Sequence, residues 1–96
     1  MERVRLLNLN QLRYFVSVAE NGSFTRAAMR QFISQTAITQ QIRALEETVG
    51  AKLLDRNSRP GSLTPAGKVF LKEAGEVLGR MDGALSRIRG ASTRPE

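Results

Sequence analysis

Two residue types that often carry enzyme chemistry are absent from this chain of 96 residues, which has no cysteine and no histidine. Without cysteine, disulfides and thiolate chemistry are excluded. Without histidine, the chain lacks the usual general base and a frequent metal ligand. The neighbouring carboxylates Glu46 and Glu47 do not face each other on a helix and make a poor catalytic pair. We therefore expect no enzyme activity, metal or cofactor.

Long apolar runs are also missing. The longest one near the start joins Phe15-Val16 to Val18-Ala19 across Ser17, which is far too short to span a bilayer. Residues 1–10 carry charge but lack the continuous apolar stretch of a signal peptide. These features predict a protein that stays in the cytoplasm and has no membrane partner.

Positive charge is what the chain has in excess. Fifteen Lys and Arg residues against nine Asp and Glu give a formal net charge of +6, spread along the chain. A small basic domain most often binds a polyanion. Hydrophobic residues make up 41% of the sequence, so one modest core is possible, and the length fits a single domain.

Capping residues and hydrophobic spacing predict two helices in the first third of the chain. The first runs from about residue 9 to 20, with Asn8 or Asn10 as its N-cap, and Gly22 ends it. Ser23 then caps a shorter helix that continues to about residue 31 and buries residues 24, 27 and 28. Phe32 and the next residue form the turn that follows.

A third helix is predicted from the N-cap Ser34 to Val49, just before Gly50. One face carries apolar side chains at helical spacing and should point to the core: Ile38, Ile42, Leu45 and Val49. The opposite face of its first turns offers hydroxyl, amide and guanidinium groups and no carboxylate. The polar residues concerned are Gln35, Thr36, Thr39, Gln40 and Arg43.

Two very short strands, at residues 52–56 and 62–64, are expected to form a hairpin around Pro60-Gly61, a pair that suits a type II turn. Arg56 lies at the base of this hairpin and Arg59 at its tip. Thr64 and Pro65 then provide an N-cap and a first helical residue. They open a long helix that continues to about residue 88 or 89.

The long helix carries an apolar seam with alternating steps of four and three residues, as in coiled coils. Because a lone helix cannot bury such a seam, we expect it to pack on its copy in a second chain. The predicted dimerisation residues are Phe70, Ala74, Val77, Leu78, Met81, Leu85 and Ile88. Gly75, Gly79 and Gly83 form a row on the opposite side, which indicates either a weak, bendable helix or a second surface for close approach.

The expected fold is mainly α: a winged helix-turn-helix with three helices and a short β-hairpin wing, followed by a long linker helix. We place the winged helix-turn-helix at residues 1–64, the linker helix at 65–90 and a frayed end at 91–96. A major groove about 12 Å wide admits one helix, whose first side chains then reach the base edges. Double-stranded DNA is therefore the expected partner.

Each polar residue has a predicted role on DNA. Base contacts are expected from Gln35, Thr36, Thr39 and Gln40, since Gln pairs with adenine and the Thr methyl contacts thymine. Arg43 contacts either a base or a phosphate. Phosphate contacts are expected from Ser23, Thr25, Arg26 and Arg30, and the cap residue Ser34 belongs to the same surface. Of the wing arginines, Arg59 more than Arg56 enters the minor groove, because Arg56 alternatively pairs with Asp55 or a carboxylate near Glu46.

A spaced set of motifs runs without gaps from about Leu9 to Gly67. It comprises Leu12-Arg13-Tyr14-Phe15, Gly22-Ser23-Phe24, Ala27-Ala28, Ser34-Gln35, Ile42, Leu45-Glu46, Gly50, Leu53-Leu54, Arg56 and Leu63-Thr64-Pro65-Ala66-Gly67. This set resembles the DNA-binding domain of LysR-type transcriptional regulators. The resemblance implies a homodimer through antiparallel linker helices, usually assembled into tetramers, on partly palindromic DNA. It also implies base contacts from Gln35 through Gln40 and from Arg59, and a backbone contact from Ser23.

The sequence departs from that family's pattern at several positions. Gln31 stands where the family usually has a buried Leu, so either the end of the second helix is irregular or Phe32 fills the gap. Gly61 replaces an apolar wing residue and should loosen the wing. The family's effector-binding domain is absent after the linker helix, so no small-molecule ligand is expected. The chain is then a fragment of a longer regulator or a naturally short protein.

One rival function from another class uses the same apolar seam. A helical interaction module would pair with a full-length regulator and block it. That function needs only the seam, whereas DNA binding also needs the polar face of the third helix. An enzyme is the third hypothesis, against which the missing histidine and cysteine count.

Overall fold

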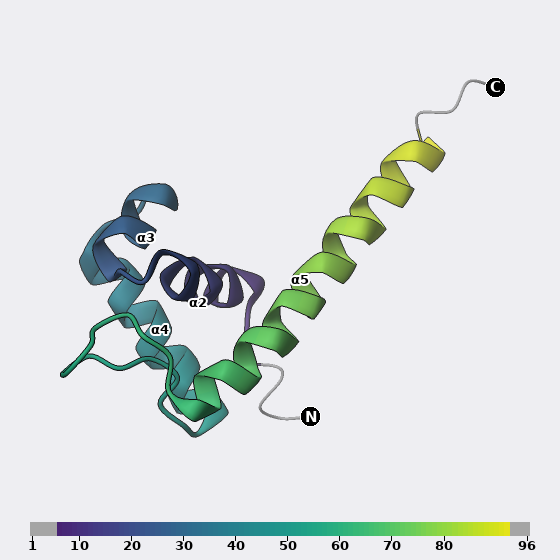
Figure 1. Cartoon of the computed structure of the whole chain (residues 1–96). Coiled ribbons are helices and arrows are strands. Elements are labelled where there is room, and N and C mark those ends of the chain that lie inside the picture. Colours follow the sequence, from purple (N-terminus) through teal and green to yellow (C-terminus); the bar gives the residue numbers. More distant parts are fainter. Residues whose placement is uncertain (1–5, 93–96) are drawn as a thin grey trace.

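The computed structural model describes residues 6–92 of the chain. Four helices follow one another within this range: α2 (Leu9–Asn21), α3 (Phe24–Arg30), α4 (Gln35–Val49) and α5 (Pro65–Ser92). Helices α2, α3 and α4 cluster together, while α5 starts against this cluster and then extends away from it (Figure 1). The predicted fold, mainly α with a helix-turn-helix and a long last helix, is confirmed.

Local hydrogen bonds explain where the helices begin and end. At the start of α2, Asn8 Oδ1 accepts from the Gln11 backbone N–H at 2.9 Å, and the Gln11 side chain accepts from the Asn8 backbone N–H at 3.4 Å. This reciprocal capping box settles the choice between the two candidate N-caps in favour of Asn8. Gly22 ends the helix in the left-handed conformation, with φ 64°.

The core lies between α2, α3, α4 and the first half of α5. Its fully buried members include Phe15, Val18, Ile38, Ile42, Leu45 and Leu53. Burying each such side chain contributes about 1.5–3 kcal/mol relative to leaving it exposed. The Phe15 ring meets Phe70 of α5 edge to face, with ring centroids 5.4 Å apart. The start of α5 is therefore part of the same folded unit as the other helices.

The wing, defined here as residues 54–63, is a minimal hairpin. Leu54 and Leu63 form one isolated antiparallel bridge in place of the two short strands that were expected. At the tip, the Ser62 backbone N–H donates to Arg59 O at 3.0 Å, and Gly61 has φ 90°. These values match the predicted type II turn at Pro60-Gly61.

Helix α5 continues through Ser92, two residues past the expected end of the linker helix. The prediction that residues 91–96 are frayed is therefore wrong for residues 91 and 92, where the Ser92 hydroxyl donates to Arg89 O at 3.2 Å. Residues 93–96, like residues 1–5, lie outside the described part of the chain. Across residues 6–92, no helix has both the length and the apolar character needed to cross a membrane.

Candidate nucleic-acid interface

The first turns of α4 carry the predicted polar face as one continuous surface. On the inner side of the helix, Ile38, Ile42 and Leu45 are fully buried. On the outer side, a shallow hollow of about 370 Å³ is lined by Gln35, Thr36, Thr39, Gln40 and Arg43, hereafter the recognition face. The structure thus brings together all five residues that the sequence singled out on this helix. None of them carries negative charge.

A hydrogen bond between helices holds the most N-terminal residue of the recognition face. The Thr25 hydroxyl on α3 donates to Gln35 Oε1 at 3.0 Å. Thr25 was expected to meet a phosphate, and in this structure it contacts the side chain that was expected to contact a base. The Gln35 amide nitrogen keeps its hydrogens for another acceptor, and Oε1 retains a second lone pair. Residue spacing alone gave no signal for this contact.

Three of the other residues predicted to contact DNA lie at the starts of α3 and α4: Ser23, Arg26 and Ser34. Ser23 caps the helix by accepting from the Arg26 backbone N–H at 3.1 Å, and Arg26 itself is exposed. Ser34 caps α4 in the same way, by accepting from the Ala37 backbone N–H at 3.0 Å. Both cap hydroxyls still carry a hydrogen to donate. These residues flank the start of the recognition face.

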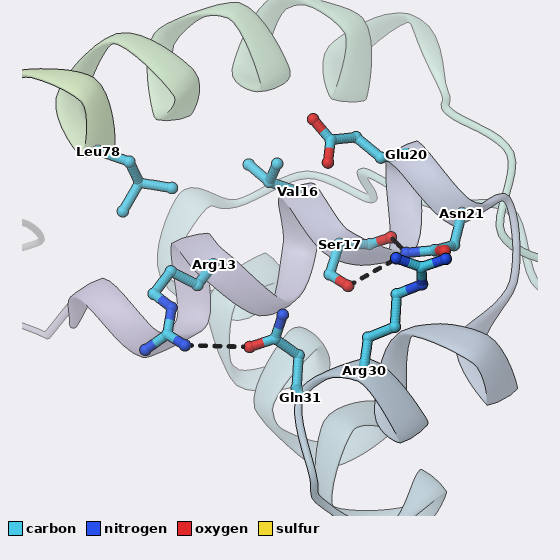
Figure 2. Close-up of a pocket in the computed structure, with 8 residues that line it drawn as sticks. All are labelled: Arg13, Val16, Ser17, Glu20, Asn21, Arg30, Gln31 and Leu78. Carbon is cyan, nitrogen blue, oxygen red and sulfur yellow. Dashed lines mark hydrogen bonds between the residues drawn. The ribbon is translucent and has the colours of Figure 1, made fainter. Parts of the chain in front are cut away.

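Arg30 lies elsewhere. It lines a separate hollow of about 610 Å³ between α2, α3 and α5, which has no lining residue in common with the recognition face. Figure 2 shows its side chain running toward Ser17 and Asn21, away from the end occupied by Arg13 and Gln31. Arg30 therefore lies in a different hollow from the recognition face, and the structure gives no support to the phosphate contact predicted for it.

The turn between α3 and α4 distinguishes the two alternatives left open at Gln31, an irregular helix end or a gap filled by Phe32. Gln31 is half-buried, and its side-chain oxygen accepts from Arg13 Nη2 at 3.2 Å (Figure 2). Phe32 does not fill the gap, because it is 94% exposed. Its backbone has φ 59°, a left-handed conformation that a bulky residue rarely adopts. The end of α3 is thus irregular, which is the other alternative that the sequence left open.

Arg59 is exposed on the wing, and hydrogen bonds to the Asp55 side chain order the loop that precedes it. The Asp55 carboxylate accepts from the Asn57 backbone N–H at 2.8 Å and from the Ser58 hydroxyl at 2.9 Å. These bonds, led by the one from Asn57, lower the pKa of Asp55 below its ordinary value of 3.8. Arg59 is exposed at the tip of this ordered loop. It is available for the minor-groove role that was predicted for it.

Gly61 does not loosen the wing, so that expectation is wrong. Gly61 is buried, and a Cβ atom placed on it would lie 2.8 Å from the backbone C and O atoms of Gly22. The absence of a side chain therefore lets the wing pack directly on the turn between α2 and α3. The residue type alone suggested flexibility, but its neighbour in space makes it a point of close contact.

Arg56 faces the inside of the domain. Its Nη1 lies 2.9 Å from Oε1 of Glu46, and its side chain is 20% exposed. Of the two roles open to Arg56, DNA contact and pairing with a nearby carboxylate, the structure therefore supports pairing. Glu46 itself is 4% exposed, and its burial was not foreseen from the sequence.

The predicted dimerisation residues are divided between the core and the surface. Ala74 is buried in the chain's own core, which argues against its predicted contact with a second chain, and Phe70 is half-buried against the same core. Leu78 is half-buried at the edge of the hollow in Figure 2. The remaining residues are between 41% and 61% exposed on the projecting half of α5: Val77, Met81, Leu85 and Ile88. They form what is called here the free seam.

Within residues 6–92, no group of three acidic side chains lies close enough together to hold a metal ion. In the row of glycines on α5, Gly75 and Gly79 have open space where a Cβ would be. The residues of the recognition face supply amide, hydroxyl and guanidinium groups.

A family model described as bacterial regulatory helix-turn-helix protein, lysR family, matches residues 9–68. The transcriptional regulator TfdT of Cupriavidus pinatubonensis is 46% identical over 86 residues, which make up 90% of this chain and 38% of TfdT. The transcriptional regulator PtxR of Pseudomonas aeruginosa is 42% identical over 95 residues, covering 99% of this chain and 30% of PtxR. The chain thus spans less than two fifths of the length of these two curated relatives.

Solved structures show the same similarity. A crystal structure of the BenM DBD with catB site 1 DNA superimposes with a TM-score of 0.88 at 39% identity, covering 93% of this chain and all of that one. A CbnR DBD–DNA complex gives a TM-score of 0.83 at 41% identity, covering 90% of this chain and 99% of that one. Both of these neighbours are complexes with DNA.

Proposed function

This chain belongs to the lysR family of bacterial regulatory helix-turn-helix proteins, and from that premise we propose that it is the sequence-specific DNA-binding part of a transcriptional regulator. The observation that carries the proposal is the recognition face, where five uncharged or basic polar side chains share one exposed hollow at the start of a helix. The relatives named as transcriptional regulators and the neighbours solved with DNA support it. Such a regulator acts in the bacterial cytoplasm and is not an enzyme.

In the proposed complex, the start of α4 enters the major groove. Gln35, placed by Thr25, contacts one base, and the side chains that follow it contact the neighbouring bases. Ser23 and Arg26 bind phosphates at the groove edge and fix the register of the helix without reading sequence. Arg59 at the wing tip enters the adjacent minor groove, where negative potential is concentrated.

We propose that two chains bind together through the free seam. Apolar side chains exposed along one helix stay in water unless a partner covers them, and a second copy supplies a matching seam. One recognition helix per half-site then accounts for a partly palindromic DNA site. In a longer regulator that contains this segment, dimers would assemble further into tetramers.

The first test is selection of bound fragments from a randomised double-stranded DNA pool at near-physiological salt. We expect a two-fold-related motif to be enriched. Gln35→Ala should then lose discrimination at one base position per half-site, by about 1–3 kcal/mol. Binding without any enriched sequence would leave only the electrostatic attraction of a chain with charge +6, and would contradict the proposal.

Arg43 provides a second, charge-matched comparison. Arg43→Ala and Arg80→Ala each remove one positive charge, but residue 80 lies on α5 outside the recognition face. A change in the selected bases with Arg43→Ala alone indicates a base contact, whereas a uniform loss of affinity indicates a phosphate contact. A triple alanine variant at positions 35, 39 and 43 tests the rival interaction module. That function needs only the seam, so it predicts that the variant and the unmodified chain bind DNA equally.

A further inference from the structure

Glu46 is a buried carboxylate in the last turns of α4, next to the exposed Glu47. Its Oε2 accepts hydrogen bonds from the backbone N–H groups of Leu53 at 2.8 Å and Leu54 at 3.2 Å. These two amides lie where the chain leaves α4 and enters the wing. The carboxylate therefore ties the first arm of the wing to the recognition helix.

The same carboxylate also holds Arg56. While Glu46 Oε1 pairs with Nη1, the guanidinium carbon of Arg56 lies 5.5 Å from the ring centroid of Phe24, the first residue of α3. Nε and Nη2 of Arg56 are buried and have no hydrogen-bond partner within residues 6–92. The ion pair and the ring contact are thus the interactions that hold this guanidinium. Arg56 is thereby fixed to α4 and α3 at once.

The Glu46–Arg56 ion pair lies close to the wing tip. Arg59 follows Arg56 by three residues, which span at most about 10 Å even when fully extended. On the other arm of the wing, Gly61 packs against the backbone of Gly22 and Ser23. Arg59 therefore projects from a short loop that is anchored on both sides to the helices that carry the other proposed DNA contacts.

A buried ion pair contributes little net stability compared with apolar side chains of the same volume, and its best-attested use is to fix one arrangement. We propose that Glu46 and Arg56 are positioning residues for DNA recognition, which set the place of Arg59 relative to the recognition face. This inference rests on the proposed DNA-binding function. Both residues act through Arg59, so preferred sites have a fixed spacing between the major-groove bases and the minor-groove flank.

Glu46→Gln tests this role, because the amide keeps an oxygen for the backbone N–H groups but removes the charge opposite Arg56. Glu47→Gln is the matched control, since it makes the same change in net charge at the exposed neighbouring position. Affinity is measured for the site that the unmodified chain selects, at a temperature where circular dichroism shows each variant to be folded. We expect Glu46→Gln to bind about tenfold more weakly than Glu47→Gln, which corresponds to about 1.4 kcal/mol.

The decisive measurement repeats this comparison in an Arg59→Ala background. If Glu46 acts through Arg59, the tenfold difference falls to within about twofold, because substitutions that act through a shared contact do not add. Pool selection with Glu46→Gln should also keep the major-groove bases and lose the preference in the flank. An equal loss in both backgrounds overturns the proposal, and so does a loss no larger than that of Glu47→Gln.

A second variant covers the case in which Glu46→Gln does not fold. Arg56→Lys keeps the positive charge opposite Glu46 but lacks the planar guanidinium that lies over Phe24. It is taken through the same cycle with Arg59→Ala and judged by the same two outcomes. If the unmodified chain selects no sequence from the pool, the proposed function fails and this inference with it, a result recognised without any variant.

Discussion

Replacing Gly61 by alanine tests how firmly the wing is held against the helices. Two costs arise at this position. A residue with a Cβ pays about 1–2 kcal/mol for the left-handed backbone, here at φ 90°. The Cβ would also lie 2.8–2.9 Å from three backbone atoms of Gly22 and Ser23. Overpacking of this kind costs about 1–3 kcal/mol, so Gly61→Ala should lower the free energy of unfolding by about 2–5 kcal/mol.

Gly22→Ala separates the two costs. Gly22 also has a positive φ, at 64°, but apart from its two chain neighbours no residue in the described range lies within 4 Å of the place where its Cβ would be. It should therefore lose only the backbone part, about 1–2 kcal/mol. Urea unfolding followed by circular dichroism gives both values, and amide hydrogen exchange at residues 55 and 61 shows whether the wing opens by itself. Equal losses in the two variants, with unchanged exchange in the wing, would show that the wing does not press on the α2–α3 turn.

Two further predictions concern α5 and the base of the wing. Gly75→Ala should raise the free energy of unfolding by about 0.8–1 kcal/mol, because among residues 6–92 the new methyl group meets no atom beyond the neighbouring helix backbone, and alanine favours the helix. Sedimentation equilibrium of the same variant distinguishes the two interpretations of the glycine row, since weaker self-association would indicate a close-approach surface. The Asp55 carboxyl should titrate by NMR below pH 3.8, because its hydrogen bonds favour the charged form in the folded state. Its contribution to stability is therefore present above pH 3.8 and is lost as the pH falls through the folded-state pKa, and Asp55→Asn should abolish this acid-side dependence.

Helix ends and the recognition face were predictable because they depend on local chemistry. Ser23 and Ser34 cap helices wherever an apolar repeat follows them, and Gly22 is suited to end the helix before them. The recognition face followed in the same way from the 3.6-residue period of α4, since a stripe with Ile38 and Ile42 inside leaves Gln35 and its companions outside.

Residues that depend on partners distant in the sequence were not predictable in this way. Glu46 and Glu47 look alike in the chain, and only the return of residues 53–56 beside α4 makes one buried and the other exposed. Phe70 and Ala74 fit a coiled-coil seam as well as Val77 does, but Phe70 packs on Phe15 of α2 and Ala74 is buried in the same core. Gly61 was misjudged for the same reason, because its role is set by Gly22.

The packing of α5 has a mechanical consequence. Its first turns are locked to the core through Phe70, so the helix cannot swivel independently of the recognition face. Its 28 residues make a rod about 42 Å long. In a dimer that pairs through the free seam, the two α5 helices would therefore set the distance and the angle between the two recognition helices. In such a dimer they would also set the separation of the half-sites, and each residue inserted between the packed and the exposed half of α5 would rotate one half against the other by about 100°.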